Sequence, residues 1–335
     1  MVPKPDDTEA CKADANGDAA VVAALENDDR TFKAVFLDLD GTLLRSNHKL
    51  SDRTVEYLRD LDAKGFFVAI ATGRDISTVY EHIIKLNFPS HPTPVICSNG
   101  ARGLLCNVEK PTNISDDAHV TFDVLFETPV PKHVATEVIQ LSKSLGCCCQ
   151  FYVAQKIYAD PSRDQHFEHT EKYQQLTGCE TVYVKDDFRA ALEIGLPSKM
   201  LVLCADPDSI LVKFQSHMEA TFANPEDRPT LIRGNWFLEV LHPSICKGVG
   251  LEKMCKHFHM PLSEVIAFGD GDNDLEFIQM AGRGVVMKNG RDMVKEAGDV
   301  VIPYTNDEDG VIQTLKVMEF AGHLRFGAGL GVKQT

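Results

Sequence analysis

The chain has 335 residues, of which 44% are hydrophobic and 25% charged, so it has the composition of a globular protein. At about 100–200 residues per domain, this length allows two or three domains. Acidic residues outnumber basic ones by 49 to 34, and the net charge of −15 argues against nucleic acid or an anionic membrane as the main partner. No membrane span is predicted, because no run of about 18 apolar residues occurs.

The ten cysteines form no C-x-x-C pair, so neither a zinc ribbon nor a thioredoxin-like motif is indicated. Several stand in apolar runs, as in Leu201–Cys204. We interpret them as small buried hydrophobic residues in a reducing cytosol. The first residues contain no basic region followed by an apolar one, so we expect no secretory signal and a cytoplasmic location.

The first third of the chain predicts alternating strands and helices after an acidic, disordered tail at 1–31. The expected elements are a strand at 34–37, a helix from an N-cap at Ser51 to Gly65, a strand at 66–71, a helix over 79–86 and a strand at 94–97. This alternation is typical of a parallel sheet with right-handed crossovers.

The pattern changes after about residue 105 and returns at Lys247. The elements expected between these points are strands at 119–126, 151–159, 181–184 and 199–204, helices at 132–145, 165–176 and 208–220, and a hairpin at 229–241. The returning pattern predicts a helix from Lys247 and strands at 265–268, 284–287 and 299–302, with helices between them.

We therefore expect an α/β fold, with a Rossmann-like parallel-sheet core, helices on both of its faces and an inserted α/β cap domain. The predicted core comprises residues 32–105 and 244–320, and the predicted cap comprises residues 106–243. Residues 321–335 are expected to form a flexible tail.

Carboxylates follow two of the expected core strands. Asp38 and Asp40 stand in D-L-D-G-T, and G-D-G-D-N-D runs from Gly269 to Asp274. Ligands of a parallel sheet bind beyond the carboxyl ends of its strands, so these acids are predicted to face the ligand crevice. Three acids in five residues indicate a hard divalent cation. An EF-hand loop from Asp270 is excluded, because its sixth and twelfth places hold Leu275 and Ala281.

Small polar turns follow the other two strands of the first third. Thr72-Gly73-Arg74 offers a hydroxyl and backbone N–H groups at a helix start, which can bind an anion, and Ser98-Asn99-Gly100 follows the next strand. Lys247, 23 residues before Asp270, is the candidate for neutralising the carboxylates and an incoming phosphate. Lys199 is the competing lysine, and we expect it to support the cap instead.

Together these motifs resemble the haloacid dehalogenase-like superfamily in their order and spacing. The resemblance rests on D-L-D-G-T, A-T-G-R, S-N-G-A, S-I-C-K-G and G-D-G-D-N-D. T-N-D-E-D-G-V at 305–311 resembles the closing motif of the Cof-type sugar-phosphatase branch. The resemblance spans residues 32–320, and it implies a large cap inserted between the second and third motifs.

The resemblance also implies roles for individual residues. Asp38 would be the nucleophile that forms an aspartyl-phosphate, and Asp40 would be the general acid and base. Mg²⁺ would be held by the Asp38 carboxylate, the Asp40 backbone carbonyl and Asp270, while Asp274 would orient Lys247 or metal-bound water. The residues implied to hold or adjoin the phosphoryl group are Thr72, Gly73 through its N–H, Lys247 and Asn273.

We predict a Mg²⁺-dependent phosphatase for small phosphorylated metabolites, sugar phosphates foremost, acting as a monomer or homodimer. A divalent cation and a lysine would remove the like-charge opposition to attack by a carboxylate on a phosphate dianion. A phosphomutase on hexose phosphates is one alternative, because it would use the same core. A non-enzymatic phospho-acceptor module is another, although such modules fit in one short domain and these motifs run from Asp38 to Asp274 around an insertion.

Overall fold

The computed structural model describes residues 19, 23, 29–109, 118–153, 156–185 and 188–327. Most of the predicted tail at 1–31, and residues 328–335 of the predicted tail at 321–335, lie outside this part of the chain. The chain divides into two compact units. The first comprises Met1–Ile70, Phe88–His91 and Phe258–Thr335, and the second comprises Ala71–Asn87 and Pro92–His257.

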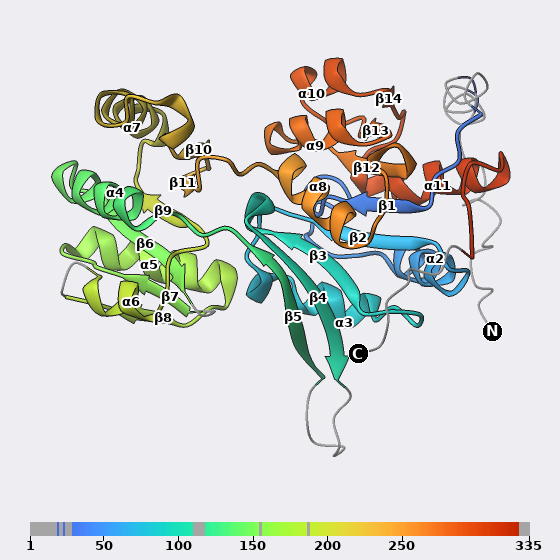
Figure 1. Ribbon diagram of the computed structural model, residues 1–335. Helices are drawn as coiled ribbons and strands as arrows, with labels where there is room; N and C mark the ends of the chain where they lie inside the picture. Colours follow the sequence, from blue (N-terminus) through green and yellow to red (C-terminus); the bar gives the residue numbers. More distant parts are fainter. Residues whose placement is uncertain are drawn as a thin grey trace, which may run out of the picture. The chain divides into compact units, whose positions relative to one another are not determined.

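The first unit contains parallel strands in the order β14-β13-β12-β1-β2 (Figure 1). Their bounds are β1 Ala34–Leu37, β2 Phe67–Ala71, β12 Val265–Gly269, β13 Arg283–Val286 and β14 Val300–Val301. Ala34 of β1 pairs with Val265 on one side and with Phe67 on the other. The central strands β12, β1 and β2 are buried along their whole length, which is why they appear in the sequence as continuous apolar runs.

Helices cover both faces of this parallel sheet (Figure 1). They are α2 Asp52–Ala63, α9 Leu275–Met280, α10 Asp292–Ala297 and α11 Gly310–Phe320. Helix α9 packs against β12 and β13, and α2 packs against α11. The predicted N-cap of α2 is confirmed, because the Ser51 side chain accepts a hydrogen bond of 3.0 Å from the Thr54 backbone N–H.

Part of the predicted carboxyl-terminal tail pairs with the start of the core. The Phe32 N–H donates to the His323 carbonyl at 2.8 Å, and the Arg325 N–H donates to the Phe32 carbonyl at 2.8 Å. The Phe326 ring lies 6.0 Å from the Phe66 ring. The described residues that follow α11 are therefore bound to the first unit by backbone and ring contacts.

The second unit contains two groups of strands. In the first group, β3 Thr93–Cys97, β4 Arg102–Glu109 and β5 His119–Glu127 pair antiparallel, and β4 and β5 form a long ribbon (Figure 1). Strand β4 is absent from the sequence-based expectation, and the predicted core boundary at residue 105 falls inside it. Its residues change from buried to exposed along its length, so they form no continuous apolar run.

The second group is a six-stranded sheet in the order β10-β11-β9-β6-β7-β8. Its strands are β6 Cys148–Val153, β7 Lys156–Ala159, β8 Thr181–Tyr183, β9 Met200–Leu203, β10 Thr230–Arg233 and β11 Phe237–Leu241. The prediction of one strand over 151–159 is wrong, because β6 and β7 are antiparallel and Val153 lies opposite Lys156. An apolar run has the same appearance whether it continues straight or reverses in a tight hairpin.

Helices bury both faces of the six-stranded sheet. Helices α4 Lys132–Ser144, α6 Arg189–Ile194 and α7 Pro207–Thr221 pack on one face, and α5 Asp164–Thr177 packs on the other through Tyr173. Helix α6, of six residues, was not predicted, because it is too short to show a helical period. The other helices of the second unit are α3 Tyr80–Leu86 and α8 Lys247–His257.

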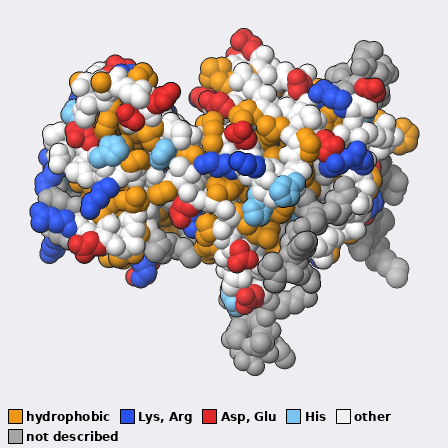
Figure 2. Space-filling model, viewed as in Figure 1, with side chains coloured by type: hydrophobic (Ala, Val, Ile, Leu, Met, Phe, Trp, Pro, Cys, Tyr) orange, Lys and Arg blue, Asp and Glu red, His pale blue; other side chains and the backbone are white. Residues whose placement is uncertain are grey.

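All nine cysteines in the described part of the chain are free, and seven are buried. Burial raises the pKa of the Cys148 thiol, on β6, to about 12. Their interpretation as small buried hydrophobic residues is confirmed for these seven. Acidic and basic side chains are interspersed on the surface shown in Figure 2. Among the described residues, no helix is both long and apolar enough to cross a bilayer.

Replacing the cap residue of α2 tests this account of the first unit. Ser51→Ala removes the acceptor for the Thr54 N–H, so we expect it to lower the free energy of unfolding by about 1 kcal/mol. Ser51→Asp supplies another capping oxygen and should cost much less. Urea unfolding followed by circular dichroism measures both variants, and equal losses would show that the hydrogen bond is not the cause.

Candidate active site

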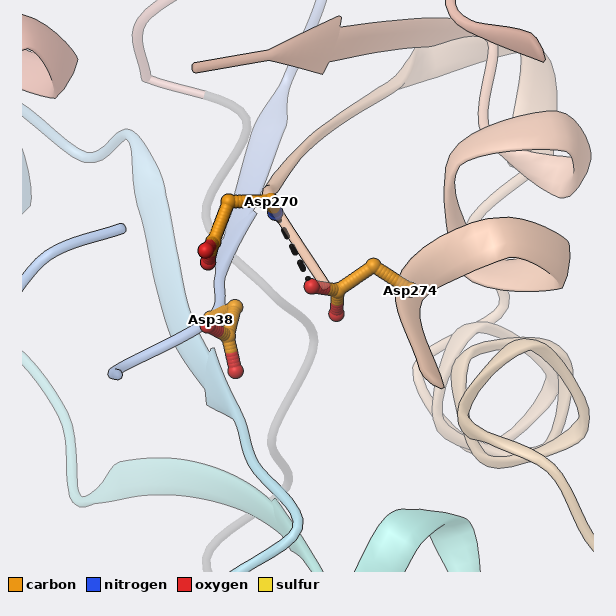
Figure 3. A group of neighbouring side chains, drawn as sticks. All are labelled: Asp38, Asp270 and Asp274. Carbon is orange, nitrogen blue, oxygen red and sulfur yellow. Dashed lines mark hydrogen bonds between the residues drawn. The ribbon is translucent and has the colours of Figure 1, made fainter. Parts of the chain in front are cut away.

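Three carboxyl groups meet at one edge of the parallel sheet. Asp38 follows β1 and Asp270 follows β12, and these two strands are neighbours. Asp274 ends the short helix η5 (Asp272–Asp274). One oxygen from each carboxyl group lies within 4.8 Å of the others, and Figure 3 shows the three side chains converging from their separate elements. The predicted convergence of Asp38 and Asp270 therefore follows from strand order.

Backbone and side-chain donors hold these carboxylates in place. Asp274 Oδ2 accepts a hydrogen bond of 3.0 Å from the Asp270 N–H (Figure 3). It also accepts one of 2.9 Å from the Gly271 N–H. The Thr42 hydroxyl donates to Asp270 Oδ1 at 2.8 Å. The D-L-D-G-T motif predicted no role for Thr42, because its contact with Asp270 joins residues 228 positions apart.

Gly41 allows the first motif to approach Asp270 closely. Its φ of +81° lies in the left-handed region, and a Cβ atom there would lie 2.3 Å from Asp270 Oδ2. The Gly41 carbonyl also accepts a hydrogen bond of 2.7 Å from Asn289 Nδ2. The glycine of D-L-D-G-T is therefore required both by its backbone conformation and by the position of the neighbouring carboxylate.

Asp40 lies outside this carboxylate cluster. Its side chain is 43% exposed, and its Oδ1 lies 3.3 Å from Nδ1 of His48. No sequence pattern predicted His48, which has a φ of +59° in a loop without a repeating pattern. Arg45 holds that loop in place, because its guanidinium donates two hydrogen bonds, of 3.0 and 2.6 Å, to the Asp309 carboxylate.

The donor set of the cluster fits a hard divalent cation. Carboxylate oxygens are the ligands that Mg²⁺ and Ca²⁺ prefer. The Asp38 and Asp274 residues are 5% and 1% exposed, and buried like charges at such short range repel one another.

The predicted site residue Asn273 is half-buried and lies in the short helix η5, between Asp272 and Asp274.

The other predicted site residues belong to the second unit. Thr72 is 1% exposed, and its hydroxyl oxygen accepts a hydrogen bond of 3.1 Å from the Arg74 N–H. The Asn99 N–H donates to the Thr72 carbonyl at 3.1 Å, and the Ser98 N–H donates to the Arg74 carbonyl at 2.8 Å. The A-T-G-R and S-N-G-A turns are therefore bound to one another.

Lys247 is the first residue of α8 and is 1% exposed. The S-N-G-A turn packs against the start of this helix, since a Cβ atom on Gly100, at a φ of +98°, would lie 2.2 Å from the Cys246 carbonyl oxygen. The competing lysine, Lys199, instead donates to the Gly73 carbonyl at 3.1 Å and to Glu239 at 2.9 Å.

A parallel sheet with clustered aspartates beyond two adjacent strands defines an α/β protein whose ligand site lies at the carboxyl edge of the sheet. A sequence profile described as haloacid dehalogenase-like hydrolase matches residues 35–315, and the chain belongs to that family. Within the family it is a phosphatase of the Cof type, as the sequence motifs predicted.

Curated relatives and solved structures agree with this assignment. The chain is 30% identical to 5-amino-6-(5-phospho-D-ribitylamino)uracil phosphatase YitU of Bacillus subtilis, over 84% of this chain and 96% of the relative. It is 26% identical to phosphatase YwpJ of the same organism, over 85% and 99%. A haloacid dehalogenase-like hydrolase from Bacteroides thetaiotaomicron aligns with a TM-score of 0.69 and 25% identity, over 87% and 100%.

Thermal melting tests the carboxylate cluster as a cation site. Mg²⁺ at a hundredfold excess over its dissociation constant should stabilise the metal-stripped protein by about 2.7 kcal/mol, because it relieves the repulsion between the carboxylates. Asp270→Asn should abolish most of this stabilisation. Asp272→Asn is the matched control, since Asp272 lies on the same loop as Asp270, pairs with Arg291 and is outside the cluster. An equal Mg²⁺ response in both variants would refute the site.

Proposed function

We propose that the protein hydrolyses phosphate monoesters of small metabolites, sugar phosphates foremost, with Mg²⁺ and through an aspartyl-phosphate on Asp38. The observation that carries the proposal is the cluster of Asp38, Asp270 and Asp274 at the carboxyl edge of the sheet. Asp38 is the first acid after β1, in the motif that gives the family its nucleophile. Membership of the haloacid dehalogenase-like family supports this chemistry.

In this proposal the Asp38 carboxylate, the Asp40 backbone carbonyl and Asp270 hold the cation. Mg²⁺ supplies positive charge that offsets the repulsion between the Asp38 carboxylate and the phosphate dianion. Thr42 and Gly41 keep Asp270 in position for this role, through the hydrogen bond and the close approach described above. Asp274 fixes the loop that carries Asp270, because it accepts the Asp270 and Gly271 N–H groups.

The proposed reaction has two steps. An Asp38 oxygen attacks phosphorus and the bond to the leaving alkoxide breaks, while Asp40 gives that alkoxide a proton. Asp40 then accepts a proton from water as the water attacks phosphorus, and the Asp38–phosphorus bond breaks to release inorganic phosphate. Division into two transfers replaces one difficult step by two easier ones. The exposure of the Asp40 side chain, at 43%, leaves it accessible to both water and a leaving group.

We assign phosphoryl binding to Thr72, the Gly73 N–H and Lys247, with Asn273 beside the phosphoryl group. A hydroxyl, a backbone N–H and an ammonium can each donate to a phosphoryl oxygen. The Thr72 oxygen already accepts the Arg74 N–H, so its own proton is available for donation to a ligand. Lys247 is buried at the start of α8, where loss of water strengthens its electrostatic effect.

The inserted segment 106–243 is proposed to act as the cap that selects the substrate. The relatives support small phosphorylated metabolites: one is named for a phosphorylated ribityl compound, and a sugar phosphatase of HAD subclass IIB shares the fold at a TM-score of 0.64 and 23% identity. The free cysteines fit a reducing compartment, and the proposal includes a cytosolic location.

Release of inorganic phosphate tests the reaction. We expect turnover with Mg²⁺ on a panel of sugar phosphates, polyol phosphates, 5-amino-6-(5-phospho-D-ribitylamino)uracil and aryl phosphates. Asp38→Asn should abolish turnover because the amide cannot form the acyl phosphate, while Asp272→Asn should remain active. Activity of Asp38→Asn within about tenfold of the unmodified protein, a difference of about 1.4 kcal/mol in the barrier, would overturn the nucleophile assignment.

The acid–base assignment makes a separate prediction. Asp40→Asn should lower kcat by about 10²–10⁴ on alkyl phosphates, which need a proton on the leaving oxygen. Aryl phosphates leave more easily, so their loss in the first step should be smaller. Single-turnover measurements of alcohol or phenol release isolate that step. Equal losses on both substrate types would contradict a proton donated by Asp40.

A further inference from the structure

A buried ion pair in the six-stranded sheet of the second unit contacts the A-T-G-R and S-N-G-A turns. Nζ of Lys199, the residue before β9, lies 2.9 Å from Oε1 of Glu239 on β11. The two side chains are only 3% and 11% exposed. Removing two charges from water costs free energy that their attraction often fails to offset. A purely apolar pair would therefore support the sheet at least as well.

Each member of the pair has a further hydrogen bond to one of the turns. Lys199 Nζ donates to the Gly73 carbonyl at 3.1 Å, in A-T-G-R. Glu239 Oε2 accepts from Asn99 Nδ2 at 2.9 Å, in S-N-G-A. The ion pair thus connects β9 and β11 to two turns that lie 126 and 140 positions away in the sequence.

The contact with Gly73 fixes the peptide plane that orients Thr72. The Gly73 carbonyl and the Arg74 N–H belong to one planar peptide group and point in opposite directions. Lys199 holds the carbonyl, and the N–H donates to the Thr72 hydroxyl oxygen at 3.1 Å. A hydroxyl that accepts this hydrogen bond keeps its own proton for donation to another group. Lys199 therefore orients the Thr72 hydroxyl through the rigid peptide group between Gly73 and Arg74.

The contact with Asn99 supports a strained turn. Ser98 and Asn99 have φ values of 50° and 53°, in the left-handed region that side chains disfavour. The Asn99 N–H donates to the Thr72 carbonyl, and its side chain donates to Glu239. The Glu239 carboxylate thus helps to keep Asn99 in a conformation that binds the Thr72 backbone.

The Lys199 ammonium keeps its charge in this setting. Burial lowers the pKa of Lys199, but Glu239, Tyr173 and Asp75 together raise it by more, so the pKa lies above its ordinary value. A charged donor binds a carbonyl more strongly than a neutral one does. The Gly73 carbonyl is therefore held by a strong and permanent donor.

We propose that Lys199 and Glu239 are positioning residues for phosphate binding, because they orient the A-T-G-R and S-N-G-A turns from the six-stranded sheet. The inference rests on the proposed function, in which Thr72 and the Gly73 N–H bind the phosphoryl group. It assigns the pair an effect on the affinity for phosphate, beyond its effect on the stability of the sheet.

Two single variants and their combination separate positioning from stability. Lys199→Met and Glu239→Leu each leave an unpaired buried charge, so each should lower the melting temperature and weaken inhibition by inorganic phosphate. The double variant has no unpaired charge, and its melting temperature should return toward that of the unmodified protein. Its inhibition constant for phosphate should remain about tenfold higher, the equivalent of roughly one lost hydrogen bond to the ligand.

Arg233→Met is the matched control, because Arg233, on β10 of the same sheet, forms an exposed ion pair with Asp208 of α7. This variant should leave the inhibition constant unchanged and should shift the melting temperature by no more than a few degrees. Recovery of phosphate inhibition together with stability in the double variant would overturn the positioning role. Should the double variant fail to fold, Glu239→Gln, which keeps the size of the side chain, should still raise the inhibition constant, and an unchanged constant would overturn the proposal.

The same measurements distinguish this inference from the proposed function. An unmodified protein that releases phosphate from none of the esters in the panel would overturn the proposed function, and this inference with it. An active, phosphate-inhibited protein whose inhibition constant is unchanged in the folded double variant would overturn this inference alone.

Discussion

The crowding of three carboxyl groups within 4.8 Å is the constraint on which the architecture of the first unit depends. Like charges this close raise the free energy of the folded state unless donors or a cation compensate them. The surrounding chain supplies part of this compensation through the Thr42 hydroxyl and the N–H groups of Asp270 and Gly271. The absence of a side chain at Gly41 leaves the space that the Asp270 carboxylate occupies. A folded state that tolerates such repulsion is well suited to bind a divalent cation.

Loops distant in the sequence support the same edge of the sheet. Asn289 donates to the Gly41 carbonyl and accepts the Asn306 N–H, while the Asn306 side chain donates to the Leu44 carbonyl. Asp309 receives both hydrogen bonds from Arg45. The T-N-D-E-D-G-V segment thus has a physical role in this chain: its polar residues fasten the loop that follows D-L-D-G-T.

The second unit places its polar groups differently. Both faces of its six-stranded sheet are covered by helices and are apolar, so a lysine and a glutamate buried there stand out as exceptions. Their outward hydrogen bonds end on the turns at Gly73 and Asn99. The Lys199–Glu239 ion pair therefore binds the turns, whereas the apolar contacts of the helices and strands hold the sheet together.

The sequence by itself determined the strands of the parallel sheet, the cap of α2 at Ser51 and the meeting of Asp38 with Asp270. Burial leaves a local pattern of apolar residues, and the carboxyl ends of neighbouring parallel strands must share one edge. Only the tertiary structure decided the contacts of Thr42 with Asp270 and of His48 with Asp40, the reversal of the chain between Val153 and Lys156, and the partners of Lys199. These depend on register and loop conformation between residues far apart in the sequence or outside any repeating pattern, and composition and periodicity carry no record of such distances.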